Sequence, residues 1–157
     1  MRKKIDNMSG LEFEDYLYYV FLNLGYEVEK TPYSVDFGAD LIIIKNKIKT
    51  VVQAKRYSGP IGVSAVQEVL GSRGYYNAKE ALVVTNSRFT ANARELAKKN
   101  NVKLWDRAVL FGYLITDDEL IGLKRKERKQ LRKRNKKRNN FKKNIDIIVE
   151  TVFKHKI

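Results

Sequence analysis

The chain of 157 residues contains no cysteine and a single histidine, His155. The absence of thiols excludes disulfide bonds, a cysteine nucleophile and cysteine-ligated zinc, and it favours a cytoplasmic protein. A single histidine excludes any metal site built from several histidines, and its position near the C-terminus argues against a serine–histidine–aspartate triad. We therefore expect any catalysis by this chain to rest on other side chains.

Long apolar runs are absent as well. No segment approaches the length of uninterrupted apolar sequence that a membrane span requires, and no apolar signal core follows the basic N-terminus. We therefore expect a cytoplasmic location and no membrane partner.

Acidic residues are scarce near the C-terminus. Residues 122–157 hold 15 Lys and Arg but only three Asp and Glu, whereas residues 1–121 hold 17 and 15. We predict a nearly neutral domain at 1–121 and a basic helical arm at 122–157. A charge run is ordinarily a solvated helix face, but eleven basic residues against one acid favour sequence-independent binding of nucleic-acid phosphates. The eleven are Lys124, Arg125, Lys126, Arg128, Lys129, Arg132, Lys133, Arg134, Lys136, Lys137 and Arg138.

The spacing of apolar residues predicts strands alternating with helices. Ser9 and Glu12 form a capping-box pattern, which opens a helix that ends near Leu24, before Gly25. The expected strands are 26–30, 40–44, 47–55, 81–85 and 102–105, and the further helices are 63–72, 91–99 and 108–114. This order predicts an α/β fold, with a mixed central β-sheet flanked by helices and a basic C-terminal helical extension.

Four polar residues interrupt the apolar pattern. Gln53 and Lys55 lie two apart on one strand, so they share a face, and a turn at 45–47 places Asp40 opposite Gln53 or its neighbour. Glu14 lies at the edge of the apolar stripe of the first helix, directed towards the protein body. A carboxylate, an amide oxygen and an ammonium on one sheet face are suited to bind magnesium and a phosphate.

Each of the four also has a plain structural explanation. Gln53 and Lys55 can form the solvated face of a half-buried strand, and Asp40 can be a turn residue after Gly38. Glu14 can be a carboxylate that favours the N-terminal end of a helix. The order and spacing of all four together favour the site.

Six segments in the order found here resemble the Mrr-like branch of the PD-(D/E)xK nucleases, the catalytic domain of type IV restriction endonucleases. They read GLEFE, LGY, SVDFGADL, VQAKRY, IGVSAVQE and VTNSRFT, starting at residues 10, 24, 34, 52, 61 and 84. The resemblance implies a restriction-endonuclease-like fold with an αβββαβ core. It also implies a Mg²⁺-dependent DNA endonuclease in which Mn²⁺ substitutes, with no cofactor other than the metal.

The resemblance also implies roles for the four polar residues. Asp40 matches the metal-binding aspartate, Lys55 the catalytic lysine, and Glu14 the helix glutamate. Gln53 stands where other branches carry an acid, and its amide oxygen can bind a metal but brings no charge. We therefore expect Glu14 to supply the missing carboxylate to the metal, directly or through a water.

Three more residues are candidates for contact with DNA. Gln67 matches a glutamine on the helix after the active strand, and it can equally hydrogen-bond a loop. Arg56 and Tyr57 directly follow Lys55 and are placed to touch a phosphate, and a simple surface role is equally open.

The sequence thus predicts a metal-dependent DNA endonuclease of the Mrr-like restriction type. Because two strands require two active sites, a homodimer is expected. One alternative is a structure-selective nuclease, such as a Holliday-junction resolvase, which suits the small size and the basic arm. A second is a non-catalytic DNA-binding protein on a nuclease fold, and the intact Asp40, Gln53 and Lys55 argue against it.

Overall fold

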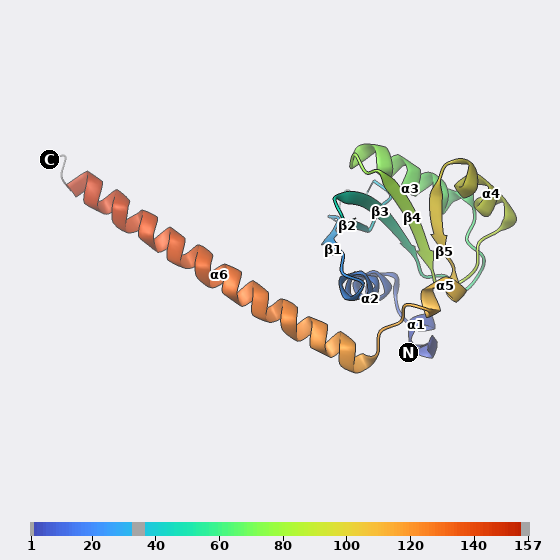
Figure 1. Ribbon diagram of the computed structural model, residues 1–157, viewed down its shortest axis with the longest axis horizontal. Coiled ribbons are helices and arrows are strands. Elements are labelled where there is room, and N and C mark those ends of the chain that lie inside the picture. The colour runs from blue at the N-terminus through green and yellow to red at the C-terminus, as the bar shows by residue number, and fades with distance from the viewer. Residues whose placement is uncertain (1, 33–36, 155–157) are drawn as a thin grey trace. The chain divides into compact units, whose positions relative to one another are not determined.

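The computed structural model describes residues 2–32 and 37–154, so His155 lies outside the described residues. Contacts within the chain form two compact units, residues 1–117 and 118–157. The first unit is a five-stranded sheet with covering helices, and the second consists of one long helix (Figure 1). A functional boundary after residue 121 stays a prediction.

The helices and strands follow the predicted order, with one helix added at the N-terminus. They are α1 (Arg2–Asp6), α2 (Gly10–Asn23), β1 (Glu27–Lys30), β2 (Leu41–Lys45), β3 (Ile48–Lys55), α3 (Val63–Tyr75), β4 (Glu80–Thr85), α4 (Ala91–Lys99), β5 (Val102–Trp105), α5 (Arg107–Phe111) and α6 (Asp117–Lys154). Helix α1 was not predicted, because five residues with Ile5 as the core contact carry no periodic signal. Helix α3 runs three residues further than expected, and α5 ends early at its cap, Gly112.

The sheet is mixed, as predicted. Its strand order is β1-β2-β3-β4-β5, with the first three strands antiparallel and β3, β4 and β5 parallel. Asn46 and Lys47 form the β2–β3 turn with φ values of 52° and 65°, and positive φ at both positions is what a type I′ hairpin turn requires. This turn sets Leu41 opposite Val52, which leaves Asp40 as the next residue beside Gln53.

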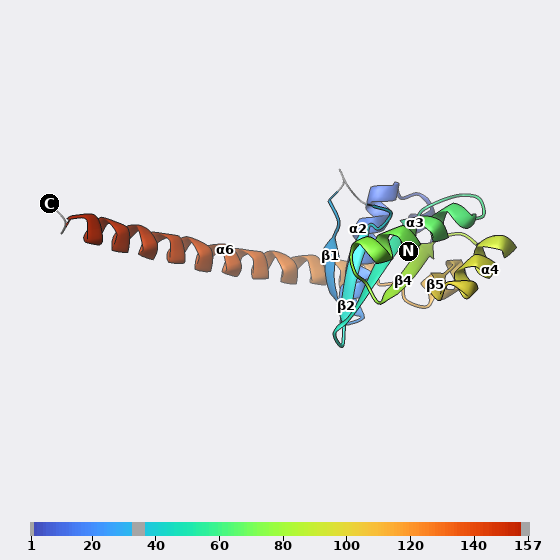
Figure 2. The same ribbon diagram turned by 90° about the horizontal axis from the view of Figure 1, so that it is seen from above.

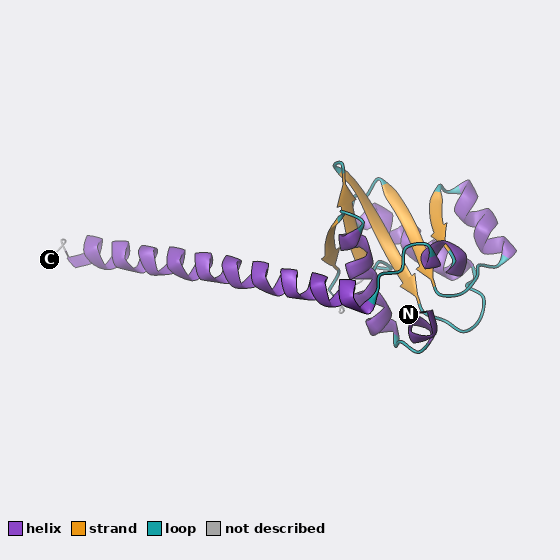
Figure 3. Cartoon of the chain, turned by 60° about the horizontal axis from the view of Figure 1, so that its bottom comes forward, coloured by secondary structure: helices purple, strands orange, loops and turns teal. Residues whose placement is uncertain are grey.

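Helices cover both faces of the sheet, as Figures 2 and 3 show from two further directions. Helices α3 and α4 bury a cluster in which Val51 and Val83 of the sheet meet Val66 and Val69. Helix α2 packs on β1, β2 and β3 through Phe13 and other side chains that lie outside that cluster. Because side chains alternate along a strand, Gln53 and Lys55 share the α3 side of β3 with Val51.

Helix α2 begins with the predicted capping box. The Ser9 hydroxyl accepts from the backbone nitrogen of Glu12 at 3.2 Å, and the Glu12 carboxylate accepts from the backbone nitrogen of Ser9 at 2.8 Å. Glu12 and Asp15 are exposed, whereas Glu14 is half-buried, which confirms the predicted direction of this third acid.

Helix α6 is 38 residues long and includes the whole basic run. This confirms the basic helical extension. In the part of the chain that the structure describes, no helix combines the length and the hydropathy that crossing a bilayer demands.

Candidate active site

Asp40 and Gln53 are in direct contact where β2 begins and β3 nears its end. Oδ2 of Asp40 accepts a hydrogen bond of 2.8 Å from Nε2 of Gln53 and another of 2.6 Å from the backbone nitrogen of Ala54. The backbone nitrogen of Asp40 donates to the carbonyl of Val52 at 2.9 Å. The predicted juxtaposition of the acid with the Gln-x-Lys strand is therefore confirmed, whereas the catalytic roles stay predictions.

The side-chain amide of Gln53 is buried, and its nitrogen has a hydrogen-bond partner whereas its oxygen has none among the described residues. The residue is 5% exposed, and its Oε1 has no hydrogen-bond partner among the described residues. A buried acceptor without a partner costs on the order of 1–3 kcal/mol, so such an oxygen has to be explained. A cation at Oε1 would satisfy it.

This donor set fits a magnesium ion. Asp40 offers a carboxylate and Gln53 an amide oxygen, and Mg²⁺ prefers hard oxygen ligands while keeping several waters. No three Asp, Glu or His side chains gather into a metal cage within residues 2–32 and 37–154. Mg²⁺ does not require such a cage when one or two carboxylates and a substrate phosphate complete its shell.

Lys55 is held by an acid that sequence reasoning did not single out. Its Nζ lies 2.6 Å from Oε2 of Glu68 on α3. Both side chains are part-exposed, so the ion pair lies where solvent and a ligand can reach it. Sequence reasoning chose the neighbouring residue, Gln67, because the family pattern contains a glutamine there.

Gln67 faces a different part of the molecule. It is exposed and lines a groove of about 300 Å³ between α3 and α4, together with Asn92 and Glu95. One step along a helix turns a side chain by about 100°, so Gln67 and Glu68 cannot face the same neighbour. Glu68, and not Gln67, is therefore the α3 residue that contacts Lys55, and a DNA-contact role for Gln67 stays a prediction.

Glu14 comes from α2, the helix on the other side of the sheet from the α3 cluster. It is half-buried in the second turn, next to the fully buried Phe13. Its role as a metal ligand stays a prediction.

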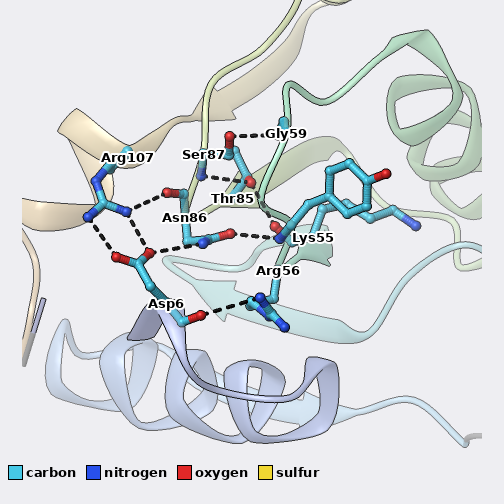
Figure 4. Close-up of polar contacts among 9 residues, drawn as sticks. Asp6, Lys55, Arg56, Gly59, Thr85, Asn86, Ser87 and Arg107 are labelled. Carbon is cyan, nitrogen blue, oxygen red and sulfur yellow. Dashed lines mark hydrogen bonds and ion pairs between the residues drawn. The ribbon is translucent and has the colours of Figure 1, made fainter. Parts of the chain in front are cut away.

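Arg56 lies at a polar cluster beyond the ends of β3 and β4 (Figure 4), and the backbone of the next residue, Tyr57, is hydrogen-bonded to the same cluster. The Arg107 guanidinium donates to both carboxylate oxygens of Asp6, at 2.6 and 2.8 Å, and Nδ2 of Asn86 donates to Oδ1 of Asp6 at 3.1 Å. Nη1 of Arg56 donates to the carbonyl of Asp6 at 3.3 Å, and Oδ1 of Asn86 accepts from the backbone nitrogen of Tyr57 at 2.8 Å. In Figure 4 the side chain of Lys55 extends away from this cluster.

The hydrogen bonds from Arg107 hold the pKa of the Asp6 carboxyl below its ordinary value, against an opposing effect of desolvation. No local pattern in the sequence predicts this contact, because Asp6 and Arg107 are 101 residues apart and α1 was not expected.

The cluster borders a cavity of about 450 Å³. Its lining residues are Asp6, Arg56, Tyr57, Ser58, Asn86, Ser87, Arg88 and Arg107. Three arginines against one carboxylate give the lining a net positive charge, and Nε of Arg56 is buried without an acceptor among the described residues. The cavity is therefore suited to an anion.

The chain is similar to several solved structures. The chain is similar to a protein of unknown function, AF1548, with a TM-score of 0.52 and 14% identity over 59% of this chain and 55% of that one. It is similar to AspBHI, a DNA modification-dependent restriction endonuclease, with a TM-score of 0.51 and 17% identity over 80% of this chain and 33% of that one. MspJI, a restriction endonuclease in complex with a 27-mer oligonucleotide, gives a TM-score of 0.49 and 18% identity over 69% and 28%.

The match spans 55% of the length of AF1548, 33% of AspBHI and 28% of MspJI, and the likeness concerns the fold alone. No curated protein matches the chain significantly. The fold is restriction-endonuclease-like: a mixed five-stranded sheet between helices, with Asp40, Gln53 and Lys55 at the edge where β2 starts.

A family model gives the more specific result. The Mrr_cat model, described as a restriction endonuclease, matches residues 5–114. Because this match covers well over half of the chain, the protein belongs to the Mrr_cat restriction endonuclease family. The family is one of nucleases, and the resemblance drawn from the sequence motifs is confirmed.

Proposed function

We propose that this protein is a metal-dependent endonuclease that hydrolyses phosphodiester bonds of DNA. The observation that carries the proposal is the contact of Asp40 with Gln53, whose amide oxygen is buried without a partner among the described residues, two positions before Lys55. If Gln53 only faced solvent on a surface strand, its amide oxygen would not be buried without a hydrogen-bond partner.

Three residues would hold the metal: Asp40 through its carboxylate, Gln53 through Oε1, and Glu14 through its carboxylate, directly or through a water. Bound Mg²⁺ supplies Lewis acidity at the phosphate and a more acidic water, and Mn²⁺ can do the same. Two hydrogen bonds, from Gln53 and from the backbone of Ala54, hold the Asp40 carboxylate in one orientation. A ligand oriented in advance binds without having to be ordered first.

Lys55 would act on the attacking water and the reacting phosphate. Its ammonium can orient the water, favour the loss of a proton from that water through its positive charge, and stabilise the negative charge that develops on the phosphate oxygens. Its backbone is held at the strand end, because the carbonyl of Lys55 accepts a hydrogen bond of 2.7 Å from the hydroxyl of Thr85.

We infer that DNA contacts lie at two places. The positively charged cavity at Arg56 and Tyr57 would take a phosphate of the strand being cut, and Arg88 would line the same contact. The eleven basic residues of α6 would bind further phosphates without regard to sequence. A DNA-contact role for Gln67 would have to use the α3–α4 groove.

The cavity can be tested through Arg88, one of its lining residues. Arg88→Ala should weaken DNA binding and leave metal binding unchanged.

The test is cleavage of supercoiled plasmid with Mg²⁺ or Mn²⁺, with and without EDTA. The wild-type protein should nick or linearise the plasmid, EDTA should prevent it, and Lys55→Ala should abolish it while keeping its fold. Lys103→Ala is a matched control, because Lys103 is also a strand lysine paired with a glutamate, Glu80, at 2.7 Å. A folded Lys55→Ala protein that cuts at the wild-type rate would exclude the mechanism.

The basic helix supports a second candidate, a structure-selective nuclease. Sequence-independent phosphate contacts suit a branched substrate as well as a linear one. Faster cleavage of four-way junctions than of methylated or unmethylated linear duplexes would favour it. DNA binding without any cleavage would favour a non-catalytic protein on this fold. We expect a homodimer, because cutting both strands needs two active sites, and sedimentation tests it.

A further inference from the structure

We propose that Glu68 is a fifth active-site residue, which supplies a carboxylate to the bound metal in addition to those of Asp40 and Glu14. The inference deepens the proposed function and rests on it. It assigns a metal-ligating role to a residue on α3, in addition to Asp40, Gln53 and Glu14.

The first support is the position of the Glu68 carboxylate. It lies 2.6 Å from Nζ of Lys55, and Lys55 shares the α3 face of β3 with Gln53. A metal held by Asp40 and Gln53 would lie within the same group of side chains, because Gln53 contacts Asp40 directly and precedes Lys55 by two residues.

The second support is a close approach between the backbone of Glu68 and the segment that precedes Asp40. Gly38, two residues before Asp40, has a φ of +82°, and a Cβ placed there would come within 2.5 Å of the carbonyl oxygen of Glu68. Only a glycine permits the chain entering β2 to lie this close to α3. The segment that leads into Asp40 is therefore packed against the backbone of Glu68.

The third support is the charge of the site. Asp40 and Glu14 would bring two negative charges, Lys55 brings one positive charge, and Gln53 brings none. A divalent cation beside an ammonium carries three positive charges in all, more than two carboxylates neutralise. Glu68 is part-exposed, so its side chain can turn from Lys55 to a metal without leaving a buried charge unpaired.

An ordinary ion pair is the competing explanation of the Lys55–Glu68 contact. A pair of that kind holds two side chains in place but has no reason to change the affinity for a metal. Metal binding measured without DNA and without turnover therefore separates the two explanations.

The experiment is Mn²⁺ binding by the full-length protein, followed by electron paramagnetic resonance of the free ion. Glu68→Gln should raise the dissociation constant for Mn²⁺ at least about tenfold, the scale of change seen when a metal site loses one supporting group. Glu95→Gln is the matched control, because Glu95 is an exposed helix glutamate paired with Lys99 at 2.8 Å, and it should bind Mn²⁺ as the wild type does. Circular dichroism of each variant checks the fold.

A rescue variant sharpens the test. Adding Gln53→Glu to Glu68→Gln returns one carboxylate to the site from the strand, and the Mn²⁺ affinity should recover most of the loss. A role confined to holding Lys55 does not predict this recovery.

Wild-type Mn²⁺ affinity in Glu68→Gln overturns the inference, and so does a loss confined to Glu14→Gln, which would make Glu14 the sole second carboxylate. Failure of the proposed function looks different. In that case the wild type cuts no DNA in Mg²⁺ or Mn²⁺, whatever Glu68 contributes to binding.

Discussion

Nε2 of Gln53 donates a hydrogen bond of 2.8 Å to Oδ2 of Asp40. The nitrogen and the oxygen of this side-chain amide therefore have different surroundings. The amide nitrogen is one of the hydrogen-bond donors to the carboxylate of Asp40, while the amide oxygen, Oε1, has no hydrogen-bond partner among the described residues. A glutamate at this position would place two carboxylates side by side.

Gln53→Glu should therefore destabilise the metal-free protein. It removes the donor to Asp40 and sets like charges against each other, so the free energy of unfolding should fall by about 1–3 kcal/mol. Millimolar Mg²⁺ should restore most of the lost free energy of unfolding, because a ligand that binds only the folded state stabilises that state. The measurement is urea denaturation at pH 8 with and without Mg²⁺.

Gln67→Glu is the control for that charge change. It introduces the same charge on the exposed side of α3, where a surface substitution is expected to alter stability by no more than about 0.5 kcal/mol. Equal losses in both variants, or a Gln53→Glu loss that Mg²⁺ leaves untouched, would contradict a metal site at Gln53.

Gly38→Ala should disturb both the fold and the site. The substitution requires an alanine at a φ of +82° and places its Cβ 2.5 Å from the carbonyl oxygen of Glu68. The strained backbone alone costs about 1–3 kcal/mol, which a thermal melt would detect as a lower midpoint.

Gly71→Ala on α3 is the opposite case and serves as the control. Among the described residues, no atom beyond the backbone of its own helix lies within 4 Å of the position that an added Cβ would take. Replacing this helical glycine with alanine should raise the free energy of unfolding by about 0.5–1 kcal/mol. A Gly38→Ala protein as stable as the wild type would show that the close approach is dispensable.

The Asp40–Gln53 contact was predictable from the sequence, and the Lys55–Glu68 contact was not. A two-residue turn at Asn46 determines the register of the hairpin, and the register brings residues a few positions away into a known pairing. The pairing of Lys55 with Glu68 instead depends on the rotation of α3 about its axis. That rotation is set by packing of the whole helix, and a difference of one residue turns Glu68 towards the site and Gln67 away from it.

The cluster around Asp6 marks the other limit of sequence reasoning. Its members come from α1, from the end of β4 and from the start of α5, and a contact across 101 residues leaves no local pattern. The strands and long helices were predictable because each buries one side at a regular period. A five-residue helix has too few positions for a period to show.

Asp6→Asn should lower stability in a pH-dependent way. The pKa of the Asp6 carboxyl is held below its ordinary value, chiefly by hydrogen bonds from Arg107, so the charged form is favoured in the folded state. Its contribution is present above the unfolded pKa and is lost as the pH falls through the folded one. The pair is about 40% exposed, and with solvent screening we expect a loss on the order of 1 kcal/mol at pH 7.

Denaturation of the wild type and Asp6→Asn at pH 7, 5 and 3 is the measurement. The difference between them should be largest at pH 7 and shrink below about pH 4. Asp117→Asn is the control, because Asp117 pairs with Lys4 at 2.8 Å on the open surface, and its removal should matter less. A difference that stays constant down to pH 3 would show that the Asp6 charge is not what stabilises the cluster.

Neutralising part of α6 should reduce the salt dependence of DNA binding. A variant with glutamine at Lys124, Arg128, Arg132 and Lys136 keeps a helix-forming residue at each position and removes four charges. Each phosphate contact contributes about 0.9 to the slope of log K against log salt, so the slope should fall in magnitude by up to about 3.6. Fluorescence anisotropy with a short duplex between 50 and 200 mM salt gives both slopes. Exchanging lysine for arginine and arginine for lysine at the same four positions keeps the charge and should leave the slope as it is. A wild-type slope in the glutamine variant would show that these four residues of α6 do not contact DNA phosphates.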